Sequence, residues 1–251
     1  MAAIGNGLVL HGGIRSFVGT FLMFADYLRP SLRLGALMEA STIFVFTHDS
    51  IGVGGDGPTH QPIGTVMSLR AIPNSTVIRP ADANESMQAW VEAVKNTHGP
   101  TSLVFTRQNV PNLDVPAGSV ARGAYILSDS DGAPEVILMA SGSEVYKCIE
   151  AQETLKNQGI EARVVSVPSF ELFDKQDDTY KEQILPHFVD VRVAMEAGAT
   201  QGWYKYVGLG GAVIGIDRFG ESAEGEEIME KFGISSANLV KTVKDILKRQ
   251  G

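Results

Sequence analysis

The densest group of polar side chains lies in two neighbouring segments, 47–50 (Thr-His-Asp-Ser) and 56–62 (Asp-Gly-Pro-Thr-His-Gln-Pro). They hold two of the five histidines, His48 and His60, with the carboxylate of Asp56 between them in sequence. The intervening glycines allow the chain to fold back and bring the three side chains together. Imidazoles donate and accept hydrogen bonds near neutral pH and a carboxylate accepts them, so this set suits a polyhydroxylated substrate. A polar loop with a capping aspartate and a surface histidine explains the same composition equally well.

Two other chemistries are less favoured for this cluster. A zinc site from His48, Asp56 and His60 would have no helical i, i+4 histidine pair and no fourth ligand, so we predict no metal site in this chain. A serine hydrolase built on Ser50 and His48 would need a G-x-S-x-G turn, which the sequence does not contain.

Two further features could bind a cofactor and an anion. Phe21, Phe24 and Tyr27 are spaced three residues apart, and a predicted helix over 20–27 would place them on one arc. Such an arc could stack on an aromatic cofactor, although helical aromatic stripes more often face a core. Arg107 follows a predicted strand, where a guanidinium suits a bidentate phosphate contact or, equally well, an acidic neighbour.

The elements that must position these residues alternate between strands and helices, which predicts an α/β fold with a mostly parallel sheet. A continuous apolar run predicts a strand over 42–46, buried on both faces, that ends directly before His48. Further strands are predicted over 76–78 and 102–105, and helices over 2–11, 32–38, 61–70 and from Asp82 or Asn84 to Asn96. The first predicted strand begins only at Thr42, which indicates that another chain completes the sheet or that the sequence begins part-way through a domain.

A stretch with two prolines and few apolar anchors, 110–119, predicts a linker to a second unit of the same class. We therefore expect two domains, 1–115 and 122–251, each a mostly parallel sheet flanked by helices, with the boundary between Asn109 and Arg122. The second domain is expected to have strands over 136–139, 163–167, 191–195 and 213–216, and helices over 143–157 and 236–250.

The composition limits the class of protein. A formal charge of −8 argues against nucleic acid or an anionic membrane as the main partner. The single cysteine, Cys148, excludes an internal disulfide. With no charged n-region and no long apolar run, the chain shows neither a signal peptide nor a membrane span, and we expect a cytoplasmic protein.

Several segments, in this order, resemble transketolase: MAAIGNG, GTFLMFADY, THDSIGVGGDGPTHQP, RPADANE, TRQN, ASGSE, ARVVSVPS and FDKQD. THDS together with DGPTHQP is the most specific of these, and GTFLMF alone would be weak. The resemblance covers only the latter part of a transketolase chain, namely the central pyrimidine-binding domain without its start and the C-terminal domain.

The resemblance implies transfer of a two-carbon ketol unit between sugar phosphates with thiamine diphosphate, as in the pentose phosphate pathway. It implies that Phe24 stacks on the pyrimidine ring of the cofactor, with Phe21 and Tyr27 beside it. His48, Asp56 and His60 would contact substrate hydroxyls or phosphate, with His48 and His60 catalytic, and Arg107 would bind the sugar phosphate.

The same resemblance places other parts of the site outside this sequence. This chain would contact only the pyrimidine end of the cofactor, and magnesium or calcium would bind on the diphosphate domain. Gly55-Asp56-Gly57 imitates the first letters of that metal motif but lies in the substrate loop. The activating glutamate of the family's R-E-x-x-M motif would lie three residues before Met1, and Gly55 stands where the loop commonly carries glutamate.

The expected partners are an N-terminal diphosphate-binding transketolase chain or domain and a second copy in a homodimer-type pairing, without which the chain would be inactive. Two alternatives remain. One is another thiamine-diphosphate enzyme, of the 1-deoxyxylulose-phosphate synthase or 2-oxo acid dehydrogenase beta type. The other is a non-catalytic binding module.

Overall fold

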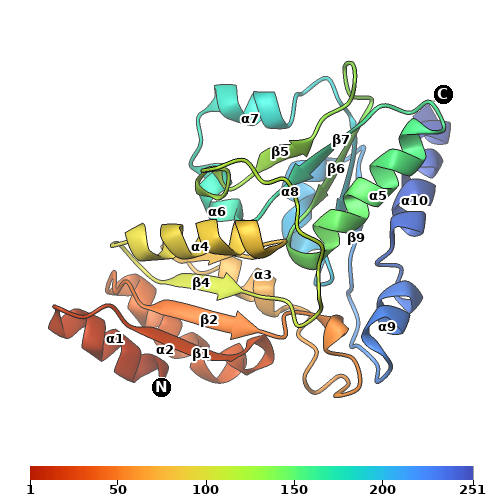
Figure 1. The fold of residues 1–251 in the computed structure, drawn as a ribbon. Coiled ribbons are helices and arrows are strands. Elements are labelled where there is room, and N and C mark those ends of the chain that lie inside the picture. Colours follow the sequence, from red (N-terminus) through yellow and green to blue (C-terminus); the bar gives the residue numbers. More distant parts are fainter. Residues whose placement is uncertain (251) are drawn as a thin grey trace.

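The computed structural model describes residues 1–250 and consists of two α/β units that pack against each other (Figure 1). The first unit has a four-stranded sheet with the order β1-β2-β4-β3, and every neighbouring pair is parallel. Its strands are β1 (Phe17–Phe21), β2 (Ile43–Thr47), β3 (Thr76–Ile78) and β4 (Thr101–Val104).

Helices cover both faces of this sheet because side chains alternate along its strands. Phe44 and Phe46 pack with α1 (Ala2–His11), α2 (Ala25–Leu37) and α3 (Thr65–Arg70). Ile43 and Leu103 instead pack with α4 (Ala83–Lys95), whose first turn is capped by the Asp82 carboxylate accepting from the backbone N–H of Glu85 at 2.8 Å. Two 3-10 turns, η1 (Leu22–Phe24) and η2 (Ile51–Val53), complete the unit.

Two expectations for the first unit were wrong. The segment 20–27 is not one helix, because it contains the end of β1, then η1 and the start of α2. β1 is an edge strand beside β2 and precedes Thr42, so the sheet does open with a strand of this chain. Gly19 interrupts its apolar run, which is why the sequence pattern predicts no strand there.

Two predicted helices have different bounds. The one expected over 61–70 begins only at Thr65, because Pro62 disfavours a helical backbone at Gln61. The one expected over 32–38 is the second half of α2. The strands expected over 42–46, 76–78 and 102–105 match β2, β3 and β4 to within a residue at each end.

The second unit has a five-stranded sheet with the order β5-β7-β6-β8-β9. Its strands are β5 (Tyr125–Ser128), β6 (Val136–Ala140), β7 (Ala162–Ser166), β8 (Val191–Met195) and β9 (Ala212–Ile214). β5 is antiparallel to β7, whereas the other pairs are parallel, so the expected class of mostly parallel sheet flanked by helices is confirmed in both units. The sequence analysis missed β5, a short edge strand.

The helices of the second unit also form two layers, and three 3-10 turns precede β5, α5 and α8: η3 (Val120–Arg122), η4 (Gly142–Glu144) and η5 (Gln201–Trp203). One layer contains α5 (Val145–Lys156), α9 (Gly225–Lys231) and α10 (Ser236–Gln250), packed on Val136, Leu138 and their neighbours. The other contains α6 (Phe170–Asp174), α7 (Asp178–Ile184) and α8 (Tyr204–Val207), packed on Ile137 and Met139. None of the helices within residues 1–250 combines the length and apolarity needed to span a bilayer.

The segment that joins the units is irregular and is fastened to α4. Leu113 N–H donates to Asp82 Oδ2 at 2.8 Å, and Gln88 Nε2 donates to the carbonyl of Pro116 at 3.0 Å. Within this segment we still propose the boundary between domains 1–115 and 122–251.

Candidate functional site

The candidate site lies at the carboxyl ends of β1 and β2, which are adjacent in the sheet. The last residues of the two strands, Phe21 and Thr47, are register partners, so the residue that follows β2 emerges beside Phe21. That residue is His48, and its imidazole stacks on the Phe21 ring with the centroids 3.7 Å apart. The parallel register therefore makes one surface from residues far apart in sequence.

Phe21, Phe24 and Tyr27, here called the aromatic wall, do lie together, although not on one helix. The centroids of the Phe21 and Phe24 rings are 6.2 Å apart and the rings are nearly parallel, and the Tyr27 ring centroid lies 6.1 Å from that of Phe24. His60 approaches the Phe24 ring edge-on at 5.6 Å. The wall thus carries an imidazole against each of its first two rings, with aromatic faces available for stacking.

His48 has an unusual backbone and a perturbed side chain. Its φ is +61°, a left-handed conformation that is uncommon for residues other than glycine. Partial burial lowers the pKa of the imidazole, and the charge of Arg107 lowers it further, against opposing effects of Asp56 and Asp49. The ring is therefore mainly neutral at pH 7, with one nitrogen able to donate and the other to accept. Its Nδ1 lies 2.9 Å from Thr47 Oγ1.

The loop 51–61 carries Asp56 and His60, and the side chain of Gln61 anchors it by hydrogen bonds. The amide of Gln61 is buried and its Nε2 donates to the carbonyls of Gly54 at 3.0 Å and Glu221 at 2.9 Å. Gly54 has a φ of +79°, and a Cβ there would lie 3.0 Å from the carbonyl oxygen of Ala223, so the turn needs glycine. Asp56 is exposed at the loop surface. The second unit therefore supports this loop through the segment around residues 221–223.

Arg107 is exposed on the segment after β4, near enough to His48 for its charge to act on the imidazole. Within residues 1–250 it forms no ion pair with a carboxylate. This favours the interpretation of Arg107 as an anion contact over that of a structural ion pair.

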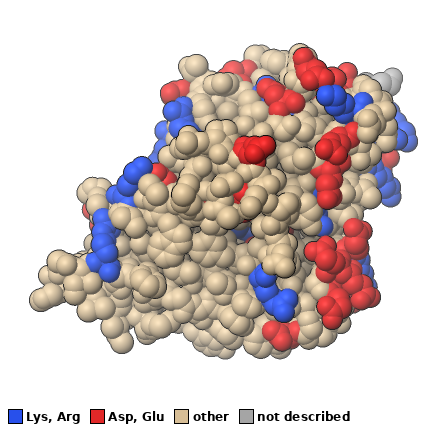
Figure 2. All heavy atoms as spheres, in the orientation of Figure 1, with Lys and Arg blue, Asp and Glu red and all other residues tan. Residues whose placement is uncertain are grey.

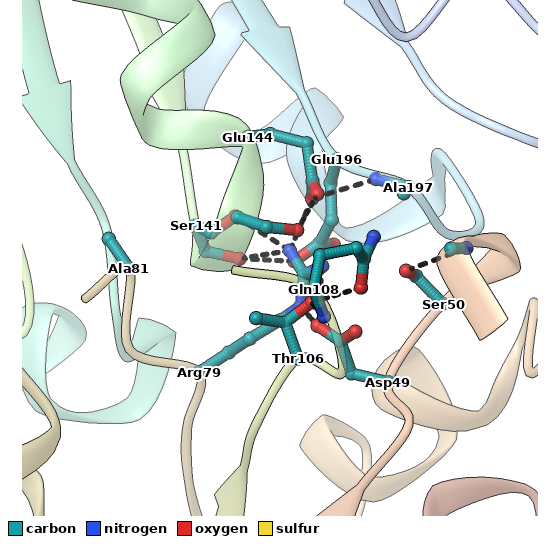
Figure 3. A network of polar contacts seen from close by, with 12 residues as sticks. Asp49, Ser50, Arg79, Ala81, Thr106, Gln108, Ser141, Glu144, Glu196 and Ala197 are labelled. Carbon is teal, nitrogen blue, oxygen red and sulfur yellow. Dashed lines mark hydrogen bonds and ion pairs between the residues drawn. The ribbon is translucent and has the colours of Figure 1, made fainter. Parts of the chain in front are cut away.

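A buried ionic cluster lies directly behind the site and was missed by the sequence analysis (Figure 3). Arg79 follows β3 and donates from Nε to Asp49 Oδ2 at 2.8 Å and from Nη1 to Glu144 Oε2 at 2.5 Å. Arg70 donates to both carboxylate oxygens of Glu196, at 2.8 and 3.0 Å. The one available signal was a charged residue placed immediately after a short, fully buried strand.

The charges of this cluster stabilise one another. Burial alone would lower the pKa of Arg79, but Asp49, Glu144 and Glu196 outweigh it and the pKa lies above its ordinary value. Burial alone would likewise raise the pKa of Glu196, but Arg70 and Arg79 lower it to about 2. Arg79 and Glu196 are therefore both charged at neutral pH.

No cluster of three or more His, Cys, Asp or Glu side chains within residues 1–250 is arranged to hold a metal ion. The zinc alternative for His48, Asp56 and His60 gains no support from the geometry. What the surface offers is aromatic stacking, hydrogen bonds to hydroxyls and one exposed guanidinium.

The surface differs sharply in character between its two ends (Figure 2). The part over α1 and β1 is largely free of charged side chains, whereas acidic side chains gather over α9, whose first turn carries Glu226 and Glu227.

Two family models match the chain in succession. Residues 1–112 match the transketolase pyrimidine binding domain, and residues 123–235 match the transketolase-like TK C-terminal domain. The chain is 51% identical to the transketolase of Bacillus subtilis (strain 168), over 99% of this chain and 38% of that relative. It therefore spans well under half the length of the curated relatives it matches.

Solved structures share the fold. Transketolase from Leishmania mexicana superimposes with a TM-score of 0.95 and 43% identity, over 99% of this chain and 36% of that chain. A chain described as split gene transketolase, inactive beta4 tetramer, has a TM-score of 0.76 over 98% of this chain and 79% of its own, and its 24% identity makes this a likeness of fold alone. With two successive domain matches and half of its residues identical to a curated transketolase, the chain belongs to the transketolase family and corresponds to its C-terminal portion, a pyrimidine-binding domain followed by a transketolase-like C-terminal domain.

Proposed function

We propose that this chain forms part of a transketolase that transfers a two-carbon ketol unit between sugar phosphates with thiamine diphosphate. The observation that carries the proposal is the contact of the aromatic wall with two imidazoles, Phe21 with His48 and Phe24 with His60. It combines a stacking surface for a heteroaromatic ring with hydrogen-bonding groups for a polyol in one place.

In this proposal the residues of the wall and of the loop have separate roles. Phe24, with Phe21 and Tyr27 beside it, stacks on the pyrimidine end of the cofactor. His48, His60 and Asp56 bind substrate hydroxyls and hold or move protons on them. Thiamine diphosphate, when bound, supplies the carbon nucleophile.

Arg107 completes the substrate site by binding the phosphate of the sugar. The support for this role is its exposure and its lack of an ion-pair partner within residues 1–250, since a guanidinium matches phosphate geometry.

The diphosphate and its magnesium or calcium ion would bind on a partner, a diphosphate-binding transketolase domain or chain. Exposed apolar side chains on α1, β1 and the end of α2 support such a partner, since Ile4, Phe17 and Leu37 are 68, 68 and 72% exposed. Exposed apolar surface is typical of protein–protein contacts. A second copy of this chain, in a homodimer-type pairing, is part of the same proposal.

Among thiamine-diphosphate enzymes, the identity of about half of the residues to curated transketolases along the whole chain favours transketolase over 1-deoxyxylulose-phosphate synthase and 2-oxo acid dehydrogenase subunits. A non-catalytic module remains the contrasting outcome of the test below.

The test is reconstitution. The chain alone, with thiamine diphosphate and Mg²⁺, should show no measurable ketol transfer and very weak binding by calorimetry, because aromatic stacking contributes only about 0.5–1.5 kcal/mol beyond area burial. A diphosphate-binding transketolase domain added in trans should restore cofactor binding.

Full turnover should require a version of the chain extended upstream by the family's R-E-x-x segment. Robust turnover by the single chain would show that its catalytic groups are wrongly assigned. Tight cofactor binding without any transfer by the extended, complete assembly would favour the non-catalytic module.

A further inference from the structure

His48 has a left-handed backbone, with a φ of +61°, which is uncommon for a residue other than glycine. Within residues 1–250, Glu39, His48 and Asn74 are the non-glycine residues with positive φ. Of these, only His48 belongs to the candidate site. Such conformations persist where neighbouring contacts over-determine them.

The residues that follow His48 supply those contacts. Asp49 is 2% exposed, and its Oδ2 accepts from Arg79 Nε at 2.8 Å and lies 2.7 Å from Nη2. Its Oδ1 is buried without a hydrogen-bond partner among the described residues, so Arg79 is what fixes this carboxylate. Ser50 then caps η2 by accepting from the Gly52 N–H at 3.2 Å.

The C-terminal unit in turn fixes Arg79. Its Nη1 donates to the carbonyl of Ser141 at 2.6 Å and to Glu144 at 2.5 Å (Figure 3). Gly142 has a φ of +63°, and a Cβ there would lie 2.4 Å from Arg79 Cζ, so backbone and guanidinium are in direct contact. Glu144 is itself held by the N–H of Ala197 at 3.0 Å.

We infer that Arg79 is a positioning residue through which the C-terminal unit, acting by way of Asp49, sets the backbone and imidazole of His48. The chain of contacts runs from Glu144 and Ser141 through the guanidinium to the residue next to His48. What the imidazole then does to a substrate rests on the proposed function, whereas the placement of His48 is a property of this chain alone. The inference gives the C-terminal unit a role at a site that lies on the other unit.

A second buried carboxyl group in the contact between the two units, here called the seam, provides a matched control. Glu85 is fully buried and accepts from Tyr125 Oη at 2.7 Å and Ser166 Oγ at 2.5 Å, both in the C-terminal unit. It also accepts from the Ala81 N–H at 2.7 Å. Glu85 thus ties the units together as Glu144 does, but it makes none of the contacts with Arg79 or Asp49.

The experiment compares Arg79→Lys, Glu144→Gln and Glu85→Gln in the full chain. NMR of the single chain follows the Cα shift of His48, which reports its backbone, and the titration of its ring protons. Arg79→Lys keeps the charge but replaces the planar fork, in which Nε meets Asp49 and Nη1 meets Glu144, with a single ammonium nitrogen. We expect it to move the His48 Cα shift toward extended-backbone values and to change its titration, and Glu144→Gln to do the same to a smaller extent.

In the complete assembly, Arg79→Lys should lower kcat by about tenfold to a hundredfold, the loss expected when a reacting group is misplaced by about 1 Å. KM for the sugar phosphate should change less. Glu85→Gln should leave both the His48 shift and kcat near their wild-type values.

Equal changes in the His48 Cα shift and ring titration in Glu85→Gln and Arg79→Lys would overturn the inference. Any disturbance of the contact between the two units would then be enough to displace His48. Unchanged His48 signals in folded Arg79→Lys and Glu144→Gln would also overturn it. If Arg79→Lys does not fold, Glu144→Gln against Glu85→Gln decides the matter. Failure of the proposed function would appear separately, as a wild-type assembly without ketol transfer.

Discussion

Polar side chains follow strand ends both at the exposed carboxyl end of the first sheet and in the buried contact between the two units. In the first region these side chains are exposed, and in the second they are paired with one another. At the edge, Arg107 and Asp56 are exposed. At the seam, Arg79 is 1% exposed and bonded to two carboxylates. Buried charge without a partner is costly, whereas exposed charge is solvated and free to meet a ligand. The exposed, unpaired charges of Arg107 and Asp56 therefore indicate the binding surface. The buried, paired charge of Arg79 indicates a structural role behind that surface.

The sharpest test of this contrast removes one arginine from each region. Arg79→Met should lower the free energy of unfolding by about 3–5 kcal/mol, because it leaves buried carboxylates without their partner. Arg107→Met should change it by less than about 0.5 kcal/mol, as surface substitutions usually do. Chemical denaturation of the two variants measures both. A similar loss of unfolding free energy in both variants would mean that Arg107 also has a structural role.

A second prediction concerns the edge itself. In a complete assembly, His48→Ala should lower ketol transfer by about a hundredfold, since it removes a group aimed at charge that develops during the reaction. Asp56→Asn should act in the same direction.

Cofactor affinity should stay nearly unchanged in both variants, and Phe24→Ala should show the opposite pattern. Titration of thiamine diphosphate and steady-state rates on the same samples separate the two classes. Weak cofactor binding with normal turnover in His48→Ala would contradict its assignment to the substrate.

Arg107→Ala should mainly raise KM for phosphorylated sugars, by about tenfold to a hundredfold. This corresponds to about 1.5–3 kcal/mol for a hydrogen bond to a charged group. An unphosphorylated ketose is the control substrate, and an equal loss with it would remove the phosphate role.

The smallest expected effect is a pH dependence that separates two seam carboxylates. Glu196 has a pKa lowered from 4.5 to about 2, despite burial, by Arg70 and Arg79. Its contribution to stability is therefore complete above pH 4.5 and is lost as the pH falls toward 2. Burial raises the pKa of Glu85, so its contribution is complete below pH 4.5 and declines as the pH rises through the raised value.

Unfolding free energies between pH 2 and 7 should therefore show a shallower acid limb in Glu196→Gln than in the wild type. Glu85→Gln should instead flatten the decline above pH 4.5. Parallel curves for both variants would mean that the two carboxyls share one environment.

The class of fold, the polar cluster and the family resemblance could all be predicted from the amino-acid sequence. Apolar runs such as Ile43–Phe46 are local patterns that report burial on both faces, and the ends of parallel strands meet at one edge, so His48 and Arg107 could be placed there in advance. The segments around His48 and His60 were also the most specific part of the resemblance that the domain matches later supported. The assigned roles of the site residues stay predictions.

The contacts that these residues make could not be predicted from the sequence and are visible only in the folded chain. β1 was missed because an edge strand has a weak local pattern and is defined by its register with β2. Arg79 meets Asp49 at a separation of 30 residues and Glu144 at 65, and no local periodicity encodes such pairs. The contacts exist because burial at the seam requires every charge to find a partner, and that requirement acts on the folded chain as a whole rather than on any segment of its sequence.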